Sequence, residues 1–270
     1  MTAYELMIKT NHYLIKGGEL TDKQKSNILG QLLSAKTTTM QAKRFYNGVK
    51  LPNNIDNCGR RMYPECFIPP YNEGKKLKTL LNQTPKTHIL SANMYELEIL
   101  RLLYLLAPLN SDVKQMVTIT LERLKSTCFG YGDDGVGECF DTSLVVLRFL
   151  ATVSPDDIIW IESRITNYNK HVNEKKCPWY SIWYYWLCLS ELQFEIAKPE
   201  IDQYKDEMVN WLKNKSCVMN SEVDKTLHPV LFCILRNILC KYPEYEYIKD
   251  REPYVNVNDG RLYFDISLLP

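Results

Sequence analysis

Four acidic residues stand within nine positions near the middle of the chain: Asp133, Asp134, Glu138 and Asp141. Carboxylate oxygens are the ligands that hard cations prefer, and Mg²⁺ is commonly held by one or two carboxylates together with bound phosphates. The residue types therefore predict an acidic site in which Asp133 and Asp134 hold Mg²⁺. Glu138 and Asp141 complete the set of four candidate catalytic carboxylates.

The glycines beside these carboxylates support a second interpretation. Gly135 and Gly137 disfavour a helix and favour a loop. The residues from 144 to 151 are almost all apolar, which predicts that a helix follows. In this interpretation the acidic loop is a solvated turn, and Asp141 is the N-cap of the helix.

Aromatic residues form a second group with chemical potential. Trp179, Trp183 and Trp186 share one face of a predicted helix. Together with Phe140 and Tyr131 they could line an apolar cavity, in which ring quadrupoles stabilise a cation. The alternative is that these rings are ordinary core residues, because aromatic side chains dominate core burial.

The elements that position both groups follow from an internal repeat. In segments 100–108, 147–155 and 235–243 a Leu-Arg pair is followed by a proline seven residues after the arginine. Arg101 and Arg148 are 47 positions apart, and Arg236 follows 88 positions later, about two such intervals. This spacing is typical of helix-pair repeats, which bury their apolar faces by stacking on one another. The repeated arginines either bind an anion or satisfy the ends of neighbouring helices.

The repeat predicts an all-α fold for residues 85–270. Segment 179–194 supplies a fourth apolar inner helix, and amphipathic outer helices alternate with the inner ones at 112–125, 156–168 and 200–213. Asp259-Gly260, between alternating β-forming residues, predicts a small C-terminal β-hairpin with a two-residue turn.

Residues 1–84 are predicted to be a helical N-terminal extension that completes one compact unit with the repeat. A helix over 3–16 ends at Gly17-Gly18, and Thr21 with Gln24 forms a capping box for a second helix. The proline-rich segment 48–74 is either a lid or binding loop, or a surface connection packed by its own aromatic residues.

Composition narrows the classes of partner. The 33 basic and 32 acidic residues give a net charge of +1, which disfavours nucleic acid as a partner. Nine scattered cysteines without a CxxC pair indicate reduced thiols. The sequence has no long apolar run and no signal-like N-terminus, so we expect a soluble, cytoplasmic protein without a transmembrane segment.

One stretch carries a family resemblance. A loop rich in glycine and aromatic residues, 129–132, leads into the inner helix, and the residues from Glu138 to Ser143 read ECFDTS. This pattern resembles the DxDDT region of class II terpene cyclases, in the terpenoid cyclase and protein prenyltransferase superfamily. The resemblance implies an α/α toroid or partial toroid around an apolar, isoprenoid-like ligand. Phe140 stands where those cyclases have their proton-donating aspartate, so standard class II protonation is not expected.

The same resemblance suggests two metals. The run from Asp133 to Glu138 is similar to the DDxxxE motif of terpene synthases, which would bind Mg²⁺. Prenyltransferases hold zinc with an Asp, a Cys and a His, and Cys177 and His228 lie at similar repeat positions. Lys175 replaces the acidic residue of that set, which argues against zinc. A second function stays open, namely a non-catalytic helical-repeat scaffold that binds a protein partner.

Overall fold

The computed structural model describes residues 1–48, 61–70, 76–131, 137–174 and 179–267. Within these ranges the regular elements are helices, apart from one short antiparallel hairpin near the C-terminus, which confirms the all-α fold class with a C-terminal hairpin. The helices are α1 (Ala3–Ile15), α2 (Asp22–Ser34), α3 (Thr39–Gly48), α5 (His88–Leu106), α6 (Ser111–Lys125), α7 (Glu138–Val153), α8 (Ile158–Glu174), α9 (Trp179–Glu191), α10 (Phe194–Asn214), α11 (Glu222–Leu239) and the 3₁₀ helix η1 (Pro243–Ile248). The strands are β1 (Tyr254–Val255) and β2 (Leu262–Tyr263).

The chain forms two compact units. The first contains residues 1–11 and 20–181, and the second contains residues 12–19 and 182–270. Within the described residues, no helix is long and apolar enough to cross a membrane.

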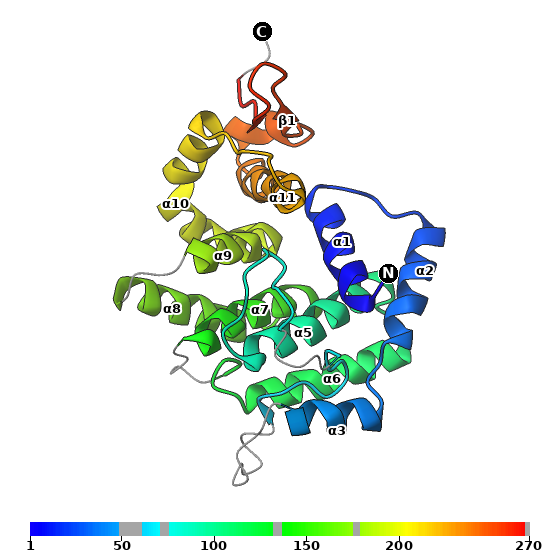
Figure 1. Ribbon diagram of the computed structural model, residues 1–270. Helices are drawn as coiled ribbons and strands as arrows, with labels where there is room; N and C mark the ends of the chain where they lie inside the picture. Colours follow the sequence, from blue (N-terminus) through cyan, green and yellow to red (C-terminus); the bar gives the residue numbers. More distant parts are fainter. Residues whose placement is uncertain (49–60, 71–75, 132–136, 175–178, 268–270) are drawn as a thin grey trace. The chain divides into compact units, whose positions relative to one another are not determined.

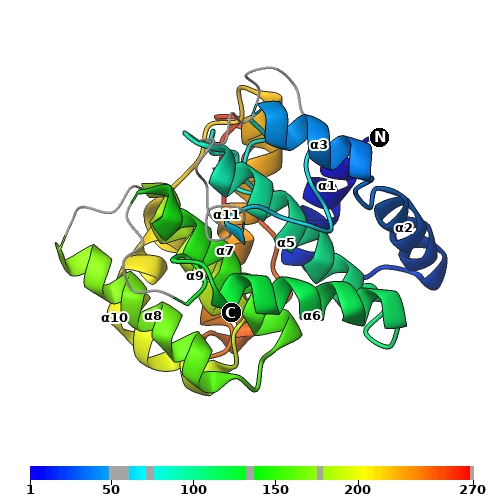
Figure 2. The same cartoon turned by 90° about the horizontal axis from the view of Figure 1, so that it is seen from below.

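The first unit is built around α5 and α7, which lie side by side (Figures 1 and 2). Both are buried on every face, α5 from Leu90 to Leu103 and α7 from Phe140 to Leu150. The outer helix α6 packs on α5, and α8 packs on α7. The alternation of apolar inner and amphipathic outer helices is therefore confirmed here, whereas closure of the repeats into a ring remains a prediction.

Local signals in the sequence fix several helix ends. Thr21 and Gln24 form the capping box of α2, as predicted. Gly17, just after α1, has φ of 88°, a left-handed conformation that glycine adopts at little cost. Thr87 caps α5 by accepting a hydrogen bond from the N–H of Ile89, which satisfies one of the free donors in the first turn.

The repeated arginines satisfy buried polar groups. In the first unit, Arg101 and Arg148 donate to Oδ1 of Asn11 on α1 at 3.2 and 3.1 Å, and Arg148 also pairs with Glu98 of α5. In the second unit, Arg236 donates to the carbonyl of Lys16 at 3.0 Å, just past the end of α1. The contact of Arg236 agrees with the prediction that the repeated arginines serve neighbouring helix ends, whereas Arg101 and Arg148 bond to side chains inside helices.

The second unit contains the pair α10 and α11 and the hairpin. Tyr254 pairs with Tyr263, and Leu262 also bonds to Cys217 on its other side. The predicted two-residue turn at Asp259-Gly260 is wrong. The N–H of Asn256 bonds to the carbonyl of Arg261, so the loop between the strands is longer than two residues. Gly260 lies inside that loop in a left-handed conformation, with φ of 66°.

Candidate functional site

The start of α7 differs from the predicted cap. The helix begins at Glu138, and its N-cap is Gly137, with φ of 61° and no side-chain cap bond. The prediction that Asp141 caps the helix is wrong, because the left-handed glycine turns the chain into the helix four residues earlier. Asp141 lies inside the first turns of α7, and only 7% of its surface is exposed.

Glu138 joins the starts of the two inner helices. Its carboxylate accepts hydrogen bonds from the N–H of Lys86, from the N–H of Thr87 at 2.6 Å, and from the Thr87 hydroxyl. These donors stand just before and at the N-cap of α5, where backbone N–H groups have no partner within the helix. We call this contact the Glu138 clamp. The carboxylate of Glu138 is therefore occupied by the backbone.

Phe140 packs into the first unit against α8. Its ring stacks on Tyr168 with centroids 5.7 Å apart and meets His171 edge-on at 4.9 Å. Such pairs stabilise a packed core beyond simple area burial. Of the predicted catalytic set, Asp133 and Asp134 lie outside the described residues.

Two tryptophans of the predicted cavity, Trp183 and Trp186, belong to the second unit. Trp183 and Trp186 are almost fully buried, and their rings meet edge-on at 5.0 Å. Trp183 also meets Trp211 of α10 at 4.9 Å, and Trp211 meets Phe232 of α11 at 5.0 Å. These contacts favour the core interpretation for both rings. The side chain of Trp179 lies outside the described part of the chain.

Tyr131 is placed differently from the other predicted cavity residues. Its backbone carbonyl accepts from Arg164 of α8 at 3.3 Å, and the carbonyl of the preceding Gly130 accepts from the indole of Trp160 at 2.7 Å. Gly130 is required here, because a Cβ at this position would overlap the carbonyl oxygen of Leu124. The loop is thus tied to α8, yet 58% of the surface of Tyr131 is exposed.

A surface hollow lies beside this loop. Its volume is about 390 Å³, and Tyr131 meets the ring of Trp160 edge-on with centroids 5.9 Å apart. Ile159, which also lines the hollow, is 80% exposed. We call this feature the Tyr131 hollow. It is lined by Lys125, Tyr131, Asp157, Ile159 and Trp160.

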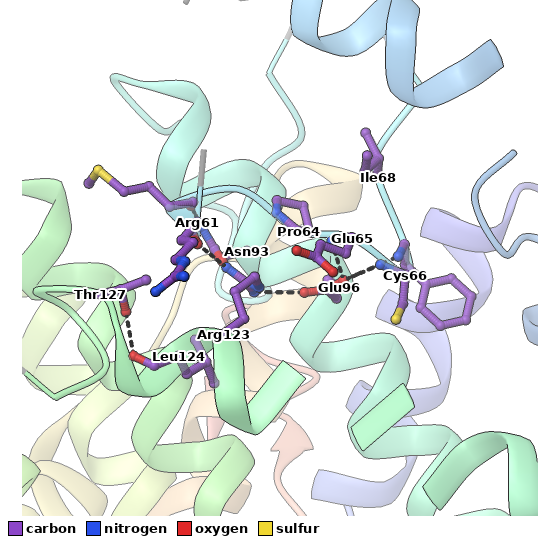
Figure 3. Close-up of polar contacts among 12 residues, drawn as sticks. Arg61, Pro64, Glu65, Cys66, Ile68, Asn93, Glu96, Arg123, Leu124 and Thr127 are labelled. Carbon is purple, nitrogen blue, oxygen red and sulfur yellow. Dashed lines mark hydrogen bonds and ion pairs between the residues drawn. The ribbon is translucent and has the colours of Figure 1, made fainter. Parts of the chain in front are cut away.

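A second feature of the first unit is a buried carboxylate with an arginine partner (Figure 3). Oε1 of Glu96 on α5 accepts from the N–H groups of Glu65, Cys66 and Phe67 at 2.9, 2.6 and 3.3 Å. Oε2 of Glu96 pairs with Arg123 of α6 at 2.7 Å, and both side chains are at most 2% exposed. We call this the Glu96 clamp.

Two more bonds complete the hold on the segment 61–67. Arg123 donates to the carbonyl of Arg61 at 3.1 Å, and Asn93 donates to the carbonyl of Met62 at 2.9 Å. Phe67 and Ile68, at the end of the segment, are buried, which agrees with the prediction of a packed surface connection. The sequence pattern did not predict the Glu96 clamp. The available signal was a glutamate near the middle of a mostly apolar helix, which is expected only where the charge is paired.

A second hollow opens between this segment and α6. It has a volume of about 330 Å³, and we call it the Arg61 hollow. Its lining is mostly charged or polar and consists of Arg61, Glu65, Ile119, Glu122, Arg123 and Ser126.

Only one of the two proposed zinc ligands, His228, lies in the described part of the chain. His228 is close to the carbonyl of Val218 through Nδ1 at 2.9 Å and to Asp224 through Nε2 at 3.8 Å. Cys177 lies outside the described residues. Among the residues that are described, no three Cys, His, Asp or Glu side chains are grouped as a metal site.

Comparison of the chain with protein-family models, with curated proteins and with solved structures finds no match. The geometry of the first unit is therefore the basis for a functional proposal.

Proposed function

We propose that the chain is a non-catalytic helical-repeat scaffold that binds a protein partner at the Tyr131 hollow. The observation that supports this proposal is an exposed aromatic ring on a firmly anchored loop, next to an exposed isoleucine. Tyrosine and tryptophan are enriched among the residues that dominate binding energy at protein interfaces. An anchored loop also loses little entropy when a partner binds.

The proposed location is the cytoplasm. The seven cysteines that the structure describes are free thiols, and several are buried as small apolar residues. Unpaired thiols are typical of proteins kept in a reducing compartment.

Site-specific photo-crosslinking tests the scaffold proposal. A benzophenone amino acid placed at Tyr131 should give a discrete adduct in cells that produce the chain. The same probe at Leu109, which is 84% exposed between α5 and α6, is the matched control. The adduct should disappear when Ile159→Glu is added. Identical adducts from both positions, or none from Tyr131, would contradict a partner site at this hollow.

A second proposal follows from the resemblance to terpenoid cyclases and prenyltransferases. Here the chain binds, and could transform, an isoprenoid-like ligand, with a Mg²⁺ ion held by Asp133 and Asp134. The supporting observation is Asp141, an acidic residue buried near the start of an inner helix. Burial changes the proton affinity of a carboxyl group and is a common feature of catalytic acids.

Ligand-induced stabilisation distinguishes the two proposals. Prenyl diphosphates with Mg²⁺ should raise the melting temperature if the chain binds them, because a ligand specific for the folded state stabilises it. The shift should be lost in Asp134→Ala and kept in Asp202→Ala, a surface substitution in the second unit. If prenyl diphosphates of every prenyl length left the melting temperature unchanged and were not turned over, the result would count against isoprenoid binding and leave the scaffold proposal in place.

A further inference from the structure

The Arg61 hollow has one wall that is fixed before any ligand binds. Segment 61–67 is held by five hydrogen bonds that involve only Glu96, Asn93 and Arg123, all of them buried. Figure 3 shows how these contacts run from the two helices to the segment. A site on a fixed wall costs little to organise on binding.

Two opposite charges on this wall remain available. Arg61 and Glu65 are both exposed, both line the hollow, and both stand on the same segment. Neither side chain forms an ion pair with another described residue, although their own backbone groups are bonded to the clamp. Because they stand only four positions apart in the sequence, the Cα atoms of Arg61 and Glu65 are at most about 14 Å apart, a gap that two long side chains can reach across from both ends.

The rest of the lining adds an apolar contact and a further acid. Ile119 of α6 is 40% exposed and offers an aliphatic surface inside a polar hollow. Glu122, one turn later on the same helix, is paired with Lys125 at 3.1 Å, but its side chain is still 69% exposed. The hollow therefore presents a guanidinium, carboxylates and an aliphatic patch within about 330 Å³.

We propose that the Arg61 hollow binds a small zwitterion with an apolar side chain, that is, a free aliphatic α-amino acid. Arg61 receives the ligand carboxylate, because a guanidinium matches that group with two parallel hydrogen bonds. Glu65 receives the ammonium group, and Ile119 contacts the aliphatic side chain. A molecule with both charges pairs with both wall residues at once, whereas a simple anion or cation leaves one of them unmatched. This site is separate from the scaffold proposal and does not depend on it.

Isothermal titration calorimetry with the full chain tests this site. L-leucine is the probe, and N-acetyl-leucine and leucine amide are its matched analogues, each lacking one charge. We expect L-leucine to bind and each analogue to bind about tenfold more weakly, which is the usual effect of losing a hydrogen bond to a charged group.

Substitutions of Arg61 and Glu65 provide a second calorimetric test. Arg61→Ala and Glu65→Gln should each weaken L-leucine binding about tenfold, because each removes one charge partner without touching the buried clamp. Arg44→Ala and Glu162→Gln are exposed, matched changes elsewhere in the first unit and should leave binding unchanged. Chemical denaturation of every variant checks that its fold is intact. Absence of heat with L-leucine, equal binding of the blocked analogues, or equal loss in the control variants would each overturn the proposal.

Discussion

Glu96 and Glu138 perform the same local task in two different environments. Each carboxylate accepts backbone N–H groups from a distant segment and holds that segment to a helix of the first unit. The Glu96 side chain is fully buried and paired with Arg123, whereas the contacts of Glu138 lie at the exposed starts of α5 and α7. Water can replace the partners of Glu138 but not those of Glu96.

Glu138 follows the conspicuous acidic loop, whereas Glu96 is hidden within α5. The difference shows that the hidden residue is the more important of the two for the stability of the fold. Removing one partner of a buried ion pair leaves an uncompensated charge and costs several kcal/mol, whereas exposed pairs contribute little. We therefore expect the Glu96 clamp to matter for the whole fold and the Glu138 clamp to matter locally.

The largest effect is expected for Glu96→Ala. This change strands the Arg123 guanidinium and three backbone N–H groups, so the free energy of unfolding should fall by about 3–5 kcal/mol. Urea denaturation followed by circular dichroism measures the change. Glu122→Ala, which removes an exposed partner of Lys125 on α6, is the control and should cost less than about 1 kcal/mol. Similar losses in both variants would refute the proposed contrast between buried and exposed carboxylates.

An intermediate effect is expected for Glu138→Ala. Loss of its bonds to Lys86 and Thr87 should cost about 1–2 kcal/mol. Hydrogen exchange should accelerate at the amides of these two residues and at the start of α5, while the centre of α7 stays protected. A uniform acceleration over α5 and α7 would show that the Glu138 clamp is as global as the Glu96 clamp.

The smallest effect is expected from pH, through His88 beside the Glu138 clamp. Burial, with a contribution from Lys76, lowers the pKa of His88, whereas the charge of Glu138 raises it. The unfolded chain, with a histidine pKa of about 6.5, then binds more protons than the folded chain as the pH falls through that value. The free energy of unfolding should decrease from pH 7.5 to pH 5.5. The decrease should be smaller in the His88→Gln variant.

The Glu138→Gln substitution sharpens the pH test. It removes the negative charge that raises the pKa of His88, so the loss of stability between pH 7.5 and pH 5.5 should become larger. Denaturation midpoints at the two pH values, compared among the parent chain and the two single variants, measure this. A flat profile in the parent would contradict the proposed role of His88.

The sequence predicted the elements of this fold well, because their signals are local. The capping residue Thr21, the break at Gly17 and the apolar faces of α5 and α7 depend only on nearby residues. The cap at Asp141 was predicted wrongly, since a carboxylate at a helix start is a common signal and Gly137 is a less common one. The positions of the helices were therefore predictable, whereas several helix boundaries were not, since α10 begins at Phe194 instead of residue 200 and α8 extends to Glu174 instead of residue 168.

The sequence was much less informative about sites, because these depend on contacts between distant residues. Glu96 meets Cys66 across 30 positions, and no periodic pattern marks that partnership. Tyr131 was grouped with buried aromatic residues, yet 58% of its surface is exposed. A charge inside an apolar helix was the one usable signal, and it indicates a buried partner without identifying it.

The contacts of Asn11 have a consequence for the order in which the chain assembles. Its two arginine partners follow it by 90 and 137 positions. During synthesis, α1 leaves the ribosome long before Arg101 or Arg148 is added to the chain. The buried amide of Asn11 therefore has neither arginine partner until the inner helices have formed. Contacts between residues so far apart in the sequence form late and slow the folding of a domain. Helix α1 is thus expected to be among the last elements to dock. A shortened chain released before the inner helices are complete would have no surface on which α1 could dock.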